Sequence, residues 1–169
     1  MCRKLRPARF PIAIFPIAMA LSACGRAVAQ AQAQPRAEAT PPAGLVPDSM
    51  KWVENPAIPK GGVITILAGK LTAPAPYAFR VRFPPDYRVM PHTHPDDRLY
   101  TVIEGTWSIG LGETLDTTKL REYPVGSVYF LPANTPHFHW SRSPSVAQIN
   151  AVGPTATVYV NPADDPRRK

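Results

Sequence analysis

Residues 91–105 read PHTHPDDRLYTVIEG, and residues 126–139 read GSVYFLPANTPHFH. The four histidines of the chain all lie in these stretches, as the pairs His92/His94 and His137/His139. Side chains two residues apart point to the same side of an extended strand, so each pair presents two imidazoles to one face. Two such strands brought together would offer three or four nitrogen ligands, which suit zinc, copper, iron or nickel. The alternative is that these are ordinary core or surface histidines.

The sequence around these stretches is typical of short β-strands. Residues 77–83 alternate strictly, with aromatic or aliphatic side chains on one face and two arginines on the other, which indicates a half-buried strand. Glycines and prolines separate the apolar runs, and the 22 prolines argue against long helices. We expect an all-β sandwich or barrel with one helical turn near 117–121. The expected strands are 63–67, 77–83, 100–104, 106–111, 127–131, 138–141, 147–152 and 155–160.

Together the two stretches resemble the two sequence motifs of the cupin family. The first motif is PHTHP followed by YTVIEG, and the second runs from Gly126 through a proline and a turn to His137. The resemblance implies an antiparallel jelly-roll barrel, the double-stranded β-helix, over residues 60–162. It implies that His92, His94 and His137 bind one divalent transition metal (Fe, Mn, Zn, Cu or Ni). Pairing into a homodimer is a further expectation from the family.

One residue departs from the cupin pattern. The family usually has a glutamate ligand seven residues before the glycine that closes the first motif, and Arg98 stands there. A guanidinium has no acceptor atom, so it cannot bind a cation. Arg98 either forms an ion pair with a nearby carboxylate or faces the cavity and binds an anionic substrate group.

Other side chains near the motifs are auxiliary candidates. Asp97 or its neighbour Asp96 either turns inward toward the metal or stays in a solvated loop. His139 is either a strand residue or a partner of the metal site. Asn134 replaces the usual glycine of the second motif, and asparagine tolerates a left-handed backbone conformation. An apolar cavity has seven candidate lining residues: Tyr77, Phe79, Tyr100, Trp107, Phe130, Phe138 and Trp140.

Charge is concentrated at the N-terminus. The formal net charge is +7, but five basic residues and no acidic residue precede Gln30. The remaining 14 basic residues nearly balance the 12 acidic ones. Nucleic-acid binding needs a basic face. The sequence therefore predicts no nucleic-acid partner.

The first 29 residues have the pattern of a secretory signal peptide, with a basic head followed by the apolar run 11–23. Cleavage is expected either before Cys24, at a lipobox-like LSAC that would make Cys24 a lipidation site, or after Ala29. The mature protein would then be periplasmic or secreted, and it would contact a membrane only through a lipid anchor on Cys24. Residues 30–59 are expected to form a flexible tether and an N-terminal arm, and 163–169 a C-terminal tail.

Three functions compete at this point. The first is an exported metal-binding cupin enzyme, such as an oxygenase or isomerase acting on a small organic molecule. The second is a cupin that binds or senses a small molecule without catalysis. The third is a structural barrel that has lost its metal, for which Arg98 is the argument. No phosphate-binding glycine loop, nucleotide fingerprint or nucleophile elbow is present, so kinase, dehydrogenase and hydrolase functions lack support.

Overall fold

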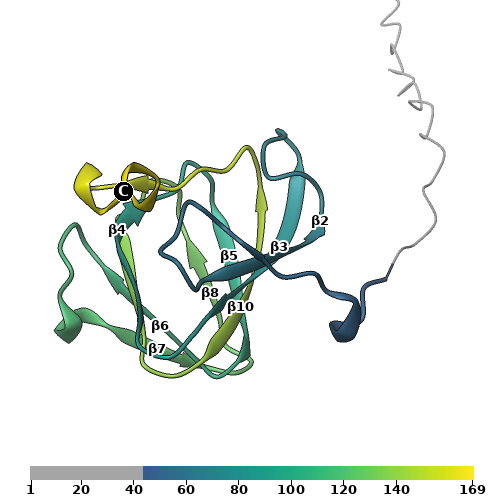
Figure 1. Ribbon diagram of the computed structural model, residues 1–169, viewed down its shortest axis with the longest axis horizontal. Coiled ribbons are helices and arrows are strands. Elements are labelled where there is room, and N and C mark those ends of the chain that lie inside the picture. The colour runs from purple at the N-terminus through teal and green to yellow at the C-terminus, as the bar shows by residue number, and fades with distance from the viewer. Residues whose placement is uncertain (1–43) are drawn as a thin grey trace, which may run out of the picture. The chain divides into compact units, whose positions relative to one another are not determined.

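The computed structural model describes residues 44–169, which form two antiparallel β-sheets facing each other (Figure 1). The helical elements of this part of the chain are four short 3-10 turns: η1 (Pro47–Ser49), η2 (Thr117–Lys119), η3 (Pro162–Asp164) and η4 (Pro166–Arg168). No helix within 44–169 is long and apolar enough to span a membrane. The expected all-β class and the turn near 117–121 are confirmed.

The larger sheet has six strands in the order β1-β2-β3-β10-β5-β8. Its strands are β1 (Val53–Glu54), β2 (Val63–Ala68), β3 (Pro76–Phe83), β10 (Ser145–Val152), β5 (Arg98–Glu104) and β8 (Val128–Leu131). The alternation expected for 77–83 is confirmed, because the odd-numbered side chains of β3 are buried and Arg82 is exposed. This alternation fixes which face of the sheet lines the interior.

The smaller sheet has five strands in the order β11-β4-β9-β6-β7. Its strands are β11 (Val158–Tyr159), β4 (Tyr87–Thr93), β9 (His137–Ser141), β6 (Thr106–Leu111) and β7 (Arg121–Pro124). β4 and β9, which carry three of the four histidines, pair directly in the middle of this sheet. The two histidine-rich stretches therefore lie side by side.

The core lies between the sheets and is rich in aromatic side chains. Phe83 of β3 stacks on Trp107 of β6, with ring centroids 4.6 Å apart, and Tyr87 of β4 packs on the same phenylalanine. Trp107 is 1% exposed. Such pairs contribute both buried apolar area and favourable ring geometry. They hold the strand faces that bear the histidines at a fixed distance from the opposite sheet.

Three strand assignments differ from expectation. Residues 121–124 are not among the expected strands, but they pair with β6 as β7. The strand expected at 155–160 contains only Val158–Tyr159, because Thr155 is used in other contacts. Residues 87–93 form β4, which is not among the expected strands, although the spacing of His92 and His94 was interpreted as that of an extended segment.

Within residues 44–169, the segments on either side of the predicted cupin domain also form defined contacts. In the expected arm, Val53–Glu54 pair with β2. The guanidinium carbon of Arg82 lies 3.9 Å from the ring centroid of Trp52. At the other end, Arg167 donates to the carbonyl oxygen of Thr157 at 2.8 Å. The predicted signal peptide, both cleavage sites and Cys24 lie outside the described residues.

Candidate metal centre

A β-bulge in β4 turns the first histidine pair toward the interior. Val89 pairs with His139, and His92 pairs with His137, so three steps along β4 match two steps along β9. The extra residue reverses the alternation of side chains, as bulges beside functional sites commonly do. As a result His92, and with it His94 two residues later, points to the same side as His137 and His139.

Every histidine is oriented by a backbone carbonyl. The Nδ1 atoms of His92 and His94 lie 2.8 Å from the carbonyl oxygens of Met90 and Ala156. Those of His137 and His139 lie 3.0 and 3.1 Å from the carbonyl oxygens of Thr135 and Ser108. A carbonyl can only accept, so each Nδ1 carries the proton and each Nε2 keeps its lone pair.

Three of these imidazoles converge. One ring nitrogen from each of His92, His94 and His137 lies within 4.8 Å of the other two, and all three residues are buried. The Nε2 atom of His137 is a buried polar atom without a hydrogen-bond partner among the described residues. An unpaired buried acceptor is costly unless a ligand satisfies it. The donor set, three neutral imidazole nitrogens, therefore fits a divalent transition metal.

Burial keeps the four imidazoles neutral. It lowers the pKa of His137 to about 4 and holds the pKa values of the other three well below the usual histidine value. The neighbouring histidines further lower the pKa of His92, and the guanidinium of Arg98 further lowers that of His94. Metal binding requires the neutral form of histidine. The site therefore holds its ligands in the binding state at neutral pH.

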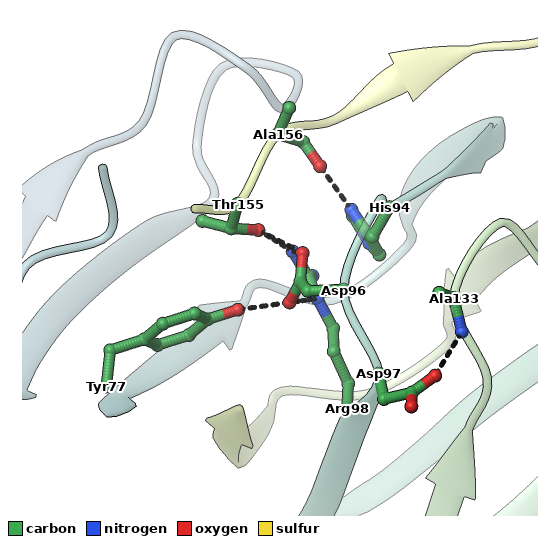
Figure 2. Close-up of polar contacts among 8 residues, drawn as sticks. All are labelled: Tyr77, His94, Asp96, Asp97, Arg98, Ala133, Thr155 and Ala156. Carbon is green, nitrogen blue, oxygen red and sulfur yellow. Dashed lines mark hydrogen bonds and ion pairs between the residues drawn. The ribbon is translucent and has the colours of Figure 1, made fainter. Parts of the chain in front are cut away.

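Arg98 and Asp96 form a buried ion pair beside the histidines (Figure 2). The Nε atom of Arg98 lies 3.0 Å from Oδ2 of Asp96, and both side chains are at least nine-tenths buried. Asp96 also accepts hydrogen bonds from the hydroxyls of Tyr77 and Thr155, the latter at 2.7 Å. Of the two functions expected for Arg98, the ion pair is present in the structure.

Of the other two auxiliary candidates, Asp97 lies away from the histidine cluster and His139 lies beside it. Asp97 is exposed, and its carboxylate accepts a hydrogen bond from the backbone N–H of Ala133 at 2.7 Å, so the structure does not bring it to the histidines. Its neighbour Asp96 is the carboxylate that turns inward. His139 lies next to the cluster, with its ring 5.3 Å from that of His137 and packed on Trp107.

A cavity of about 280 Å³ opens beside the histidines between the two sheets. Phe79, Tyr100 and Trp107 line it as expected, and His92, His94, His139 and Arg98 supply its polar groups. The other four aromatic candidates do not line the cavity: Phe130 is 59% exposed, Trp140 stacks with Arg88, the hydroxyl of Tyr77 bonds to Asp96, and the ring of Phe138 packs against Gly110. A small, mostly apolar cavity with a few polar groups is the usual form of a small-molecule site.

Solved structures share this fold. The polyketide cyclase RemF from Streptomyces resistomycificus is similar over 75% of this chain and 90% of its own, with 19% identity and a TM-score of 0.61. An RmlC-like cupin from Shewanella frigidimarina is similar over 64% of this chain and 87% of its own, with 13% identity and a TM-score of 0.51.

A third structure is the DMSP lyase DddQ from Ruegeria pomeroyi, with 19% identity, 66% of this chain and 61% of that chain covered, and a TM-score of 0.53. No family profile matches the sequence, and no curated protein matches it. The chain is an all-β jelly roll with a buried three-histidine cluster, consistent with a metal site. Its fold is that of the cupin superfamily, as the sequence motifs predict.

Proposed function

We propose that this protein is a metal-dependent enzyme that acts on a small organic molecule, with the metal held by His92, His94 and His137. The observation that carries the proposal is the unpaired, buried Nε2 atom of His137, which faces two other imidazoles held by backbone carbonyls. Ordinary core histidines would satisfy both ring nitrogens. The arrangement is what a metal ligand set requires.

The cavity residues suit chemistry at such a centre. When bound, the metal would act as a Lewis acid, since three protein ligands leave coordination positions open. The aromatic wall formed by Phe79, Tyr100 and Trp107 excludes water and gives a flat substrate a packing surface. His139 donates its Nδ1 proton to the carbonyl oxygen of Ser108 and lines the same cavity, so its Nε2 keeps a lone pair.

Of the two reaction classes expected from the sequence, oxygenase and isomerase, we favour a proton-transferring isomerase. The observation behind this choice is that His139 keeps an unprotonated ring nitrogen and lines the cavity, although burial lowers its pKa and so makes it a weak base.

The test compares the full chain stripped with a chelator and then reloaded separately with Fe, Mn, Zn, Cu or Ni. Each form is incubated with small carbonyl compounds and organic acids, and products are followed by NMR with and without oxygen. We expect metal-dependent turnover that does not need oxygen and that falls about 100-fold or more in His139→Gln at unchanged metal content. Tight ligand binding without turnover in any metal form would instead favour the non-catalytic binding protein.

We also propose that the protein is exported, on the pattern of its first 29 residues. Mass spectrometry of the mature protein from a cell that makes it distinguishes the two cleavage sites. A start at lipidated Cys24 indicates a membrane-anchored lipoprotein, and a start at Gln30 indicates a soluble exported protein. A full-length cytoplasmic protein that begins at Met1 would contradict the proposal.

A further inference from the structure

We infer that Arg98 binds an anionic group inside the cavity, so that the substrate is a small organic acid. The inference deepens the proposed function, on which it rests for the presence of the metal. It does not need the metal to be tested, because Arg98 and the cavity are features of the chain itself.

The first support is that Arg98 is fixed in place by other residues. It leaves β5 on the inward side, in line with Tyr100 and Val102, which are both buried. Its Nε donates to Asp96 at 3.0 Å, and its Nη2 donates to Thr155 (Figure 2). With Nε and Nη2 held by these contacts, the guanidinium is fixed in position and Nη1 is the donor that remains, so little further entropy is lost when Nη1 binds a ligand.

The second support is the atom that these contacts leave free. Within residues 44–169, Nη1 of Arg98 makes no hydrogen bond, whereas Nε and Nη2 both do. Among the described residues, the only fully buried side-chain nitrogen or oxygen without a hydrogen-bond partner is Nε2 of His137. Because Nη1 of Arg98 has no partner either, it must keep some accessible surface, although the residue as a whole is only 5% exposed. Arg98 lines the cavity together with His94, so its side chain is in contact with the space that a ligand would occupy.

The third support is the balance of charge. Among the described residues that line the cavity, two are arginines and none is acidic, and each arginine is paired with a carboxylate outside the lining, Arg98 with Asp96 and Arg167 with Asp165. The carboxylate of Asp96 accepts hydrogen bonds from Arg98, Tyr77 and Thr155. These contacts occupy its oxygens and balance its charge, so it is not a free metal ligand. Three neutral histidines leave the charge of a divalent ion uncompensated. An anionic ligand would compensate it in a poorly solvated site.

The probe pair is benzoate and benzamide, which have nearly the same shape and differ in charge. Isothermal titration calorimetry measures both against the full chain, first metal-free and then loaded with Zn²⁺, with metal content determined on the same samples. We expect benzoate to bind about tenfold or more tightly than benzamide.

Two variants test Arg98 without leaving a buried charge unpaired. Arg98→Lys keeps the charge but loses the planar guanidinium and its free Nη1, and Asp96→Asn/Arg98→Met removes both charges together. In each, we expect benzoate affinity to fall about tenfold while benzamide affinity and Zn²⁺ content stay the same. Arg88→Met is the matched control, since Arg88 is exposed, stacks on Trp140 and lies outside the cavity.

The inference is wrong if benzoate does not bind the wild-type chain in either form. It is also wrong if both variants keep wild-type benzoate affinity while thermal melting shows that they are folded. A chain that takes up no Zn²⁺ but binds benzoate in an Arg98-dependent way would overturn the metal proposal and leave this inference standing.

Discussion

The backbone carbonyls that face the four Nδ1 atoms decide what the histidines can do. Each carbonyl holds a proton on Nδ1, and the opposite nitrogen is then an acceptor pointing into the barrel. Burial adds to this effect by keeping the rings uncharged. At the residue scale, the site is therefore set by backbone contacts before any ligand arrives, two of them local (Met90 and Thr135) and two from distant segments (Ala156 and Ser108).

The lowered histidine pKa values predict a pH-dependent stability of the metal-free chain. The unfolded state takes up protons near pH 6.5, while the folded state resists them down to about pH 4 at His137. Within this window the unfolded state binds more protons, so stability falls as pH falls. The expected loss is about 1.4 kcal/mol per pH unit for each buried histidine.

Urea unfolding of the metal-free chain at pH 7, 6 and 5 measures this loss. The corresponding slope should become smaller in His139→Gln, which removes one of the titrating rings. A free energy of unfolding that stays constant from pH 7 to pH 5 would show that the histidines are not held neutral in the folded chain.

The three proposed ligands and the unusual position of Arg98 could be predicted from the sequence, because the motif spacing carries them. The partners of Arg98 could not. Its ion pair with Asp96 is completed by Tyr77 and Thr155, which lie 19 and 59 residues from Asp96 in the chain. Asp97 satisfies a loop N–H at Ala133, 36 residues away. Contacts at such separations depend on the tertiary fold and leave no local pattern.

At the scale of strands, the bulge in β4 is the feature that makes the site. Without it, the inward alternation that begins at Tyr87 and Val89 would continue to Pro91 and Thr93. The histidines would then face the opposite side of the sheet. The extra residue lies opposite Phe138, between the pairs Val89/His139 and His92/His137.

Deleting Met90 from the bulge is expected to restore regular pairing and turn His92 and His94 out of the interior. Because a one-residue slip exchanges the two faces, bound metal should fall to near zero while far-UV circular dichroism still shows a β-protein. Deletion of Glu113, which is exposed between β6 and η2, is the matched control and should leave metal content unchanged. Full metal content in the Met90 deletion would contradict this function of the bulge.

Close packing between β6 and β9 predicts a second effect. Gly110 pairs with Phe138, and a Cβ added at Gly110 would lie 2.1 Å from the phenylalanine ring, which is completely buried. Gly110→Ala should therefore destabilise the fold by about 1–3 kcal/mol. Chemical denaturation measures it against Gly44→Ala, where the added carbon meets nothing. Equal stability of the two variants would show that Phe138 moves aside freely.

Strand prediction succeeded where side chains alternate and failed where they do not. β6 matches the expected 106–111. β5 begins two residues before the expected 100–104, and β8 begins one residue after the start of the expected 127–131. β7 reads REYP, which has no apolar alternation, because it is an edge strand with half or more of its residues exposed. β4 was missed because its bulge breaks the period of two. The left-handed backbone expected at Asn134 is present, with φ of 58°.

At the scale of the whole described unit, segments outside the two motifs help to enclose the cavity. Asn55, Ala57 and Ile58 before β2, and Thr157 and Arg167 after β10, line it together with the barrel strands. Tyr159 of β11 donates a hydrogen bond to the carbonyl oxygen of Ala57 at 3.0 Å, which ties the two segments together. The homodimer and the lack of a nucleic-acid partner stay predictions.

The contacts of Arg167 predict that it holds the C-terminal segment over the cavity. Its guanidinium bonds to Asp165 and to the carbonyl oxygen of Thr157. Arg167→Ala should increase amide hydrogen exchange in residues 155–169 and leave β3 and β10 unchanged. Arg168→Ala removes the same charge next to it and serves as the control. Exchange that is equal in the two variants would show that Arg167 does not hold this segment.

The central claim is that His92, His94 and His137 bind a metal, and metal content tests it most directly. The full chain is purified without chelator and analysed by mass spectrometry for transition metals, beside the variant His92→Ala/His94→Ala. The account predicts about one metal ion per wild-type chain and a loss of that ion in the variant. A wild-type chain that stays empty after incubation with iron, manganese, zinc, copper and nickel would contradict it.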